Sequence, residues 1–410
     1  GNMTQLIVTL ASFALIPILI KKKFKLSYAI LAVTLSISIF SGLGILTLGE
    51  TALGVVLDRY SRDTILTVTM VGILGSLMKH YGILQRIVDA MLSLITSKKV
   101  ILMVLPSLIG IMSVPGGAVL SAPFINTIGD ELQITPPRRA AINLIFRHIS
   151  MFLFPFTTTM MFIKAAIPEL NVYKVIGLGL PFVAGTVLIG YMLFMRGKGN
   201  GEEGDRDVSL RGIGRLVVVS SPIYMSVVIN VVTGLPFFIS MLGSILIVYL
   251  LGDRKDFLYK AYNSINYNTI ILVTSILILK DIILQMDDML QMINKMLMGV
   301  EGGLGVMVIF TLVSFFFGYI TGYPTSSLAI TLPLLSMMDL GSNALHIYTF
   351  FLVAVSFVGY YYSPLHLCQV LTIGEMKVTT GDLYKEYLPY FALQMLLIFA
   401  TTLGLMAIFA

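Results

Sequence analysis

Two breaks interrupt apolar segments of this chain, and they constrain its fold more than any other feature. The first is S-V-P-G-G from residue 113, and the second is F-P-F-T-T-T from residue 154. Both lie in sequence apolar enough for a lipid bilayer, where each unpaired backbone N–H or C=O group costs several kcal/mol. Irregular backbone persists at that depth only where it lines a polar cavity or contacts other protein. The breaks therefore predict a binding site, formed by a re-entrant hairpin at 99–129 and a discontinuous helix at 137–165.

The same layout recurs later, with T-G-Y-P-T-S-S around Pro324 and Y-Y-Y-S-P-L-H-L around Pro364. These two prolines are 40 residues apart, and so are Pro115 and Pro155. The order of the flanking apolar segments also repeats, which is the sequence signature of an internal structural repeat. The repeat predicts a second hairpin and a second discontinuous helix, at 303–338 and 345–373.

The composition places the chain in the membrane. It is 57% hydrophobic with a mean hydropathy of +0.93, and 12% of its residues are charged, whereas a soluble domain has about 25%. We therefore expect an all-α polytopic membrane protein in contact with the lipid bilayer. The basic residues lie in loops and read as orientation signals, so no nucleic-acid partner is expected. The single cysteine, Cys368, excludes an internal disulfide and a cluster of cysteine ligands.

The hydrophilic stretch at 197–211 divides the chain into two repeats, 1–196 and 212–410. Expected spans lie at about 5–20, 27–48, 64–83, 172–195, 213–233, 235–251, 269–285 and 383–409. Each half crosses the membrane five times if its hairpin enters and leaves on one side, so the second half is inverted relative to the first. With both termini outside, most of the 27 Lys and Arg residues fall on the cytoplasmic side, as the positive-inside rule requires. We expect a multi-pass protein of the cell (inner or plasma) membrane.

Opposed hairpins beside broken helices are typical of secondary transporters with inverted repeats. Half-helix N-termini favour an anion, and unwound carbonyls can hold a cation. The expected substrate-binding residues are Ser113, Pro115, Gly116, Gly117, Thr157, Thr158, Tyr323, Thr325, Ser326, Ser363, His366 and Arg147. The expected sodium ligands are Ser113, Thr159, Thr321 and Ser327. The alternative for each hydroxyl is a hydrogen bond to its own or a neighbouring helix.

Charged candidates are few. Arg147 lies eight residues before Pro155, about 12 Å along a helix, so it either snorkels to the cytoplasmic interface or contacts the substrate. His366 follows Pro364 and either binds an anion or a proton, or repairs the helix break by bonding a carbonyl. No Asp or Glu lies in either hairpin or at either break. A core without acids suits a small anionic solute, with sodium held by carbonyls and hydroxyls as the possible driver and no other cofactor.

Three motifs resemble a known family: M-S-V-P-G-G-A-V-L-S-A-P (112–123), N-L-I-F-R-H-I (143–149) and S-P-L-H-L-C-Q-V-L-T (363–372). They look like family 401 of the domain-of-unknown-function series, within the ion transporter superfamily. The superfamily resemblance implies a homodimer in which a scaffold domain supports a moving transport domain, an elevator. The sodium symporters of that superfamily carry Ser-Asn-Thr tips, and here neither tip has asparagine. The proline-glycine tip resembles the gluconate permeases, which implies a proton-coupled sugar acid.

The expected function is thus a secondary active transporter of a small organic anion, a carboxylate or sugar acid, coupled to sodium or protons. A sodium/proton antiporter is the first alternative, although the pair of core acids typical of that class is missing. A passive channel is the second, because broken helices also line pores. No H-E-x-x-H motif, Gly-x-Gly-Asp motif or matched serine and histidine indicates an intramembrane enzyme.

Overall fold

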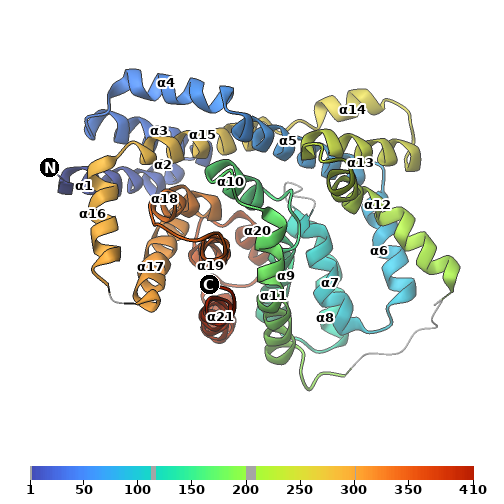
Figure 1. Cartoon of the computed structure of the whole chain (residues 1–410). Helices are drawn as coiled ribbons and strands as arrows, with labels where there is room; N and C mark the ends of the chain where they lie inside the picture. The colour runs from blue at the N-terminus through green and yellow to red at the C-terminus, as the bar shows by residue number, and fades with distance from the viewer. Residues whose placement is uncertain (1, 112–116, 200–208, 301) are drawn as a thin grey trace.

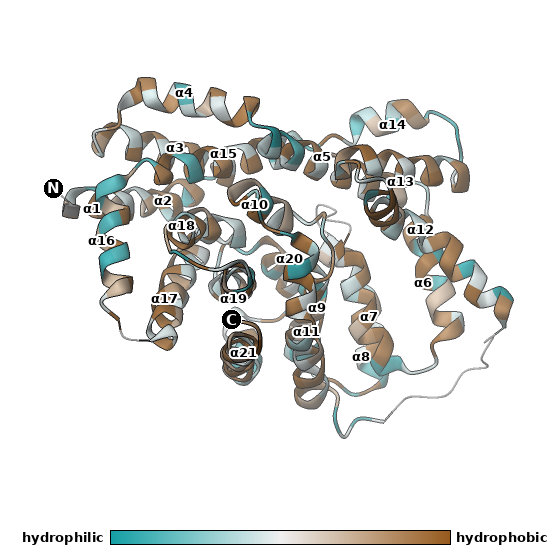
Figure 2. Cartoon of the chain, viewed as in Figure 1, coloured by the Kyte–Doolittle hydropathy of each residue, from teal (hydrophilic) through white to brown (hydrophobic). Residues whose placement is uncertain are grey.

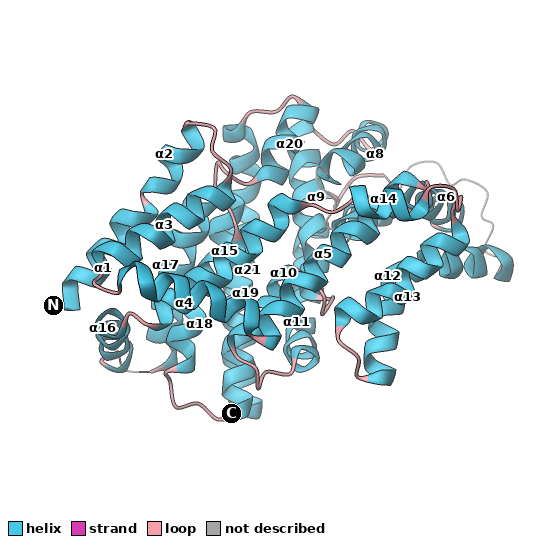
Figure 3. Ribbon diagram, turned by 90° about the horizontal axis from the view of Figure 1, so that it is seen from above, coloured by secondary structure: helices cyan, strands magenta, loops and turns pink. Residues whose placement is uncertain are grey.

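The computed structural model describes residues 2–111, 117–199, 209–300 and 302–410, and within these ranges all regular structure is helical (Figure 3). The helices of the first half are α1 (Asn2–Phe13), α2 (Leu15–Lys21), α3 (Leu26–Phe40), α4 (Gly44–Leu57), α5 (Arg59–His80), α6 (Ile83–Leu94), α7 (Lys98–Ile111), α8 (Gly117–Glu131), α9 (Pro136–Ile149), η1 (Ser150–Phe152), α10 (Thr158–Ala166) and α11 (Val172–Phe194). Those of the second half are α12 (Leu210–Thr233), α13 (Phe237–Leu251), α14 (Phe257–Asn263), α15 (Tyr267–Leu284), α16 (Asp287–Met298), α17 (Gly303–Thr321), α18 (Pro324–Ser336), α19 (Ser342–Tyr362), α20 (Leu367–Met376) and α21 (Thr380–Phe409).

Seven helical segments of the described chain are long and apolar enough to cross a membrane. Hydrophobic residues cover much of their length (Figure 2), which is consistent with a polytopic membrane protein. Most of these segments are largely uncovered by protein, whereas α19 is almost entirely buried among other helices. Helix α19 is therefore the centre of the fold, and the segments around it carry the surface available to lipid.

The prediction of one continuous span at 27–48 is wrong at its C-terminal end. Helix α3 stops at Phe40, and α4 starts again at Gly44. Between them the backbone takes positive φ angles at Gly42 (90°) and Gly44 (86°), a conformation that glycine adopts readily. The apolar segment therefore contains a turn that its hydropathy does not indicate. The other expected spans lie close to helices, as α11 does to 172–195.

Each expected hairpin range holds two helices that pack against each other, α7 with α8 and α17 with α18. Pro324 stands in the first turn of α18, where its missing N–H costs nothing. Gly322 ends α17 with a φ of 61°, and an added Cβ there would lie 2.7 Å from the Cβ of Leu365. The second hairpin therefore abuts the break between α19 and α20.

Contacts between the two halves come in matched pairs. Helix α3 packs on α15 and α13 on α5; α8 packs on α20 and α18 on α10; α11 packs on α19 and α21 on α9. In the predicted repeat α3 corresponds to α13, α5 to α15, α8 to α18, α9 to α19, α10 to α20 and α11 to α21. Replacing both helices of one contact by their counterparts gives the other contact of the pair. Each hairpin packs on the broken helix of its own half, α7 and α8 on α9 and α17 and α18 on α19, and it also contacts the broken helix of the other half.

Two hydrophobic clusters hold the helices together. The larger one includes residues of the hairpins, the broken helices, α3 and α15. The smaller one joins α5 and α6 to α12 and α13, the group that lies to the right in Figure 1. Burial of apolar side chains and close helix packing both contribute to these clusters.

Candidate functional site

The two helix breaks form two helix starts. The first broken helix passes from α9 through η1 and resumes as α10, where the Thr157 hydroxyl accepts a hydrogen bond from the Met160 N–H at 3.3 Å. The second resumes as α20 after Pro364, and no side chain caps it. Because the first backbone N–H groups of a helix have no partner within the helix, both starts present donors to any anion beside them.

Four helix starts meet around these breaks: those of α8, α10, α18 and α20. A chain of contacts links them. Gly117, the first residue of α8, lies against the Arg147 guanidinium. Arg147 is followed by His148, whose ring centroid lies 5.2 Å from that of His366, the residue before α20. Gly322, just before α18, lies against Leu365, just before α20, and α18 packs on α10. The partial positive ends of four helix dipoles thus converge on one region.

Arg147 lies inside the protein, with 3% of its surface exposed. The expectation that it reaches the cytoplasmic interface is therefore wrong for this structure. The side chain runs past α7 and α8 at two glycines: an added Cβ on Gly110 would clash with the Arg147 backbone, and one on Gly117 would lie 2.6 Å from Nη2. The Nη1 atom has no hydrogen-bond partner, and among the described residues no carboxylate forms an ion pair with Arg147.

His366 and His148 lie side by side, with ring centroids 5.2 Å apart. The Nδ1–H group of His148 donates to the Leu144 carbonyl at 2.7 Å, so its Nε2 accepts from the Tyr360 hydroxyl at 3.2 Å. The His366 ring lies on the Tyr360 ring with centroids 3.8 Å apart, yet neither of its nitrogens has a hydrogen-bond partner. His366 thus does not repair the proline break by bonding a carbonyl.

The expected hydroxyls divide into two sets. Buried Thr325 and Ser326 have hydroxyls without a partner. The hydroxyls of Thr321 and Ser327 donate to backbone carbonyls of their own segments, those of Phe317 and Pro324, at 2.8 Å, as the alternative reading holds. Ser363 accepts from the Leu365 N–H at 3.1 Å and so shapes the second break. Thr159 is buried in the first turn of α10.

Three expected site residues, Ser113, Pro115 and Gly116, lie outside the described residues. The other expected residues lie at or beside the four helix starts.

Charge in the protein interior is of one sign. Among the described residues no Asp or Glu is buried, whereas Lys99, Arg139, Arg147 and Lys280 are. Arg139 pairs with Asp130 at 2.6 Å and Lys280 with Asp281 at 2.7 Å. Arg147 and Lys99 have no carboxylate partner among the described residues, but Lys99 lies over the Tyr191 ring, 5.7 Å from its centroid. A buried charge without a counter-ion costs free energy, so the site around Arg147 favours an anion.

A polar network that the sequence did not single out holds the first hairpin to the second broken helix. The Asn143 amide donates to the Ala118 carbonyl at 3.2 Å and to the Thr372 hydroxyl at 3.1 Å, and its oxygen accepts from Ser121 at 2.6 Å. These residues come from α9, α8 and α20. In the sequence, only the asparagine within an apolar segment indicates this network. The partners of the asparagine depend on how the helices pack.

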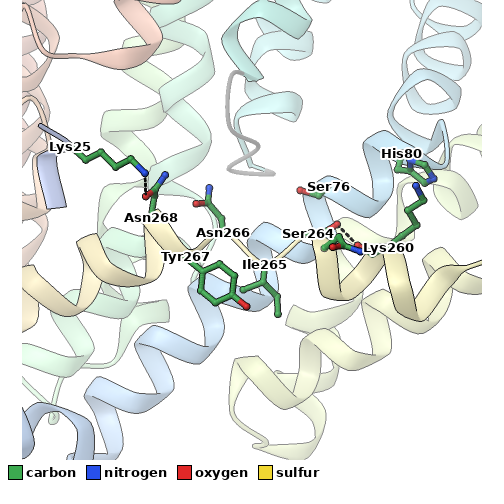
Figure 4. Close-up of a pocket in the computed structure, with 10 residues that line it drawn as sticks. Lys25, Ser76, His80, Lys260, Ser264, Ile265, Asn266, Tyr267 and Asn268 are labelled. Atoms are coloured by element: carbon green, nitrogen blue, oxygen red, sulfur yellow. Dashed lines mark hydrogen bonds between the residues drawn. The ribbon is translucent and has the colours of Figure 1, made fainter. Parts of the chain in front are cut away.

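An open cavity of about 670 Å³ lies elsewhere, between the ends of α5, α14 and α15 (Figure 4). Its charged side chains are Lys25 and Lys260, with His80 beside them, and Lys25 donates to Asn268 at 2.9 Å. None of its described lining residues is an expected site residue. The cavity is on the side for which the loop charges predict a cytoplasmic location, and its basic lining attracts anions.

The fold and site define an all-helical chain of the polytopic membrane class, with a polar, cationic interior at its helix breaks. The sequence model of the family described as "Protein of unknown function (DUF401)" matches residues 4–407. The chain therefore belongs to this family. A search of curated proteins found no match.

Proposed function

We propose that this protein is a secondary active transporter of a small organic anion, a carboxylate or a sugar acid, coupled to sodium or protons. The observation that carries the proposal is the Arg147 guanidinium, which is buried where four helix starts converge and has no carboxylate partner in the described part of the chain. An anion there would receive charge-assisted hydrogen bonds from Arg147 and from the free N–H groups of α20.

The unpartnered hydroxyls of Thr325 and Ser326 support the same conclusion. A buried hydroxyl without a partner loses free energy, and an oxygen-rich substrate would satisfy both. The mixture of one cation with several hydroxyls is what a hydroxylated carboxylate requires. Sodium is assigned to the hydroxyls of Thr159, Thr321 and Ser327, and the alternative driver, a proton, to His366.

The matched contacts between the halves support two inverted repeats. An inverted repeat brings corresponding elements together across a pseudo-two-fold axis, and the pairs α8–α20 and α18–α10 have this relation. We assign the hairpins and broken helices to a moving transport domain and the cluster of α5, α6, α12 and α13 to the scaffold of an elevator, which works as a homodimer in the cell membrane.

Ligand-dependent melting of the purified protein tests the proposal. A ligand that binds only the folded state raises the melting temperature by mass action. We expect one class of carboxylates or sugar acids to raise it, and the same compound to show saturable uptake into proteoliposomes. The measurement is made in sodium and in choline, at two pH values, so that the coupling ion is read from the same panel.

Other outcomes would overturn the proposal. Stabilisation by sodium alone, without any anion response, would favour a sodium/proton antiporter. Anion flux that does not saturate and ignores both ion gradients would favour a channel. The arginine variants described in the Discussion show whether the response depends on the proposed site.

A further inference from the structure

Three potential metal ligands from distant parts of the chain meet beside Tyr360. His148 belongs to α9, while His366 and Cys368 stand at the start of α20. Their ligand atoms, one ring nitrogen from each histidine and the sulfur of Cys368, all lie within 4.8 Å of one another. We propose that these three residues form a binding site for a transition-metal ion of the zinc type. The proposal stands whether or not the chain transports an anion.

The donor set and its spacing fit such an ion. Zinc binds imidazole nitrogen at about 2.0–2.1 Å and thiolate sulfur at about 2.3 Å, which puts tetrahedral ligand atoms about 3.3–3.7 Å apart. The three ligands must therefore draw in by about 1–1.5 Å at most. Three protein ligands leave a fourth position open, as in zinc sites that bind an exogenous ligand.

The orientation of His148 is already that of a metal ligand. Its Nδ1–H donates to the Leu144 carbonyl, which fixes the tautomer and leaves a lone pair on Nε2, the atom that faces Tyr360. Metal-binding histidines almost always donate their other N–H to such a partner. The Tyr360 hydroxyl now bonded to Nε2 turns away when the ion binds.

The ring nitrogens of His366 support the metal site independently of the spacing of the three ligands. His366 is fully buried, and both of its ring nitrogens lack a hydrogen-bond partner. Leaving a buried polar group unsatisfied costs about 1–3 kcal/mol. Contact with the tilted Tyr360 ring explains where the His366 ring lies but does not satisfy its nitrogens. A bound ion would satisfy one of them.

Cys368 gives the ion access. It is the single cysteine of the chain and is partly exposed. Binding converts its thiol to a thiolate and releases one proton. No oxidation or reduction is involved, so the reaction is metal entry with loss of that proton.

Because the chain has one cysteine, alkylation reports on the site directly. Purified, reduced and metal-free protein is treated with a maleimide with and without Zn²⁺, and Co²⁺ is titrated separately to detect thiolate-to-cobalt charge-transfer absorption. We expect Zn²⁺ to slow alkylation of Cys368 at least about tenfold, and Co²⁺ to give the charge-transfer band at one ion per chain. Loss of an outer-shell partner weakens metal binding about 10- to 100-fold, and we expect His366→Asn to weaken it more.

Two controls separate the site from general effects. His80→Asn removes an exposed histidine outside the cluster and leaves protection unchanged. Tyr360→Phe removes the hydroxyl that competes for His148 Nε2 and leaves cobalt binding intact or tighter. Absence of both protection and the charge-transfer band in the unmodified chain would overturn the proposal, and so would full protection in His366→Asn.

Discussion

The guanidinium of Arg147 lies against the first residue of α8, Gly117, so closely that an added Cβ would stand 2.6 Å from Nη2 and 3.2 Å from Nη1. Because Gly117 has no side chain, it leaves room for the Arg147 guanidinium at the start of helix α8. Since helix α9 supplies the charge and the hairpin supplies the space, substrate binding and hairpin position are expected to depend on each other.

Arg147→Gln is expected to remove most of the anion response. Hydrogen bonds to a charged group contribute about 1.5–3 kcal/mol, which corresponds to about 10- to 100-fold in Kd. Arg147→Lys keeps the charge but loses the planar fork, and should retain part of the affinity. Anion-dependent melting and binding titrations measure both. Arg138→Gln is the control, because Arg138 pairs with Glu386 in a partly exposed ion pair, which contributes little to stability. Equal losses in all three variants would contradict the role of Arg147.

Gly117→Ala should weaken anion binding while the protein stays folded. The new methyl group displaces the end of a flexible side chain, the Arg147 guanidinium, and not backbone. We therefore expect a melting temperature near that of the unmodified protein without ligand, and a smaller rise with the anion. Gly72→Ala in α5 is the matched control, since nothing lies within 4 Å of its added Cβ. A normal anion response in Gly117→Ala would show that the guanidinium position does not matter.

Asn143→Ala should lower the stability of the protein and leave the groups that bind the anion in place. It removes the amide that joins α9 to Ala118 and Thr372 and leaves buried groups unsatisfied, at about 1–3 kcal/mol. Thermal melting without ligand measures the change. Asn268→Ala is the comparison, because that exposed side chain accepts a hydrogen bond from Lys25 at the surface. Equal melting temperatures for the two variants would mean that the buried network contributes little.

The helix breaks could be predicted because proline and glycine act locally. Pro324 starts α18 and Pro364 separates α19 from α20, as their missing N–H groups require. The turn after Phe40 was missed for the opposite reason. Its glycines stand inside an apolar run, where hydropathy alone indicates a continuous span.

The partners across the site could not be predicted, since they depend on how helices pack. Asn143 meets Thr372, and His148 meets His366, only because α9 lies against α20. Arg147 shows the same limit. Its distance from the break allowed either the interface or the interior, and the choice is made by the space that Gly110 and Gly117 leave on the hairpin.

The orientation of the chain is a separate prediction. In a Cys368→Ser background, single cysteines introduced by Lys22→Cys and Lys295→Cys lie at exposed positions. With the N-terminus outside, a membrane-impermeant maleimide labels position 295 in intact cells and labels position 22 only after permeabilisation. The reverse pattern would invert the topology and place the basic cavity outside.

Metal and anion binding should strengthen each other. A divalent ion with one thiolate, Cys368, carries a net positive charge beside Arg147, and the open fourth position can take an anionic oxygen. Coupling between two sites is typically about 1–3 kcal/mol, or about 5- to 150-fold, and is reciprocal. The carboxylate that raises the melting temperature most should therefore tighten Co²⁺ binding, and Zn²⁺ should tighten binding of that carboxylate by the same factor. In Arg147→Gln the coupling should fall, because less charge is left to neutralise, while Co²⁺ alone still binds. Metal binding that is unaffected by the anion would separate the two sites and leave each to stand on its own test.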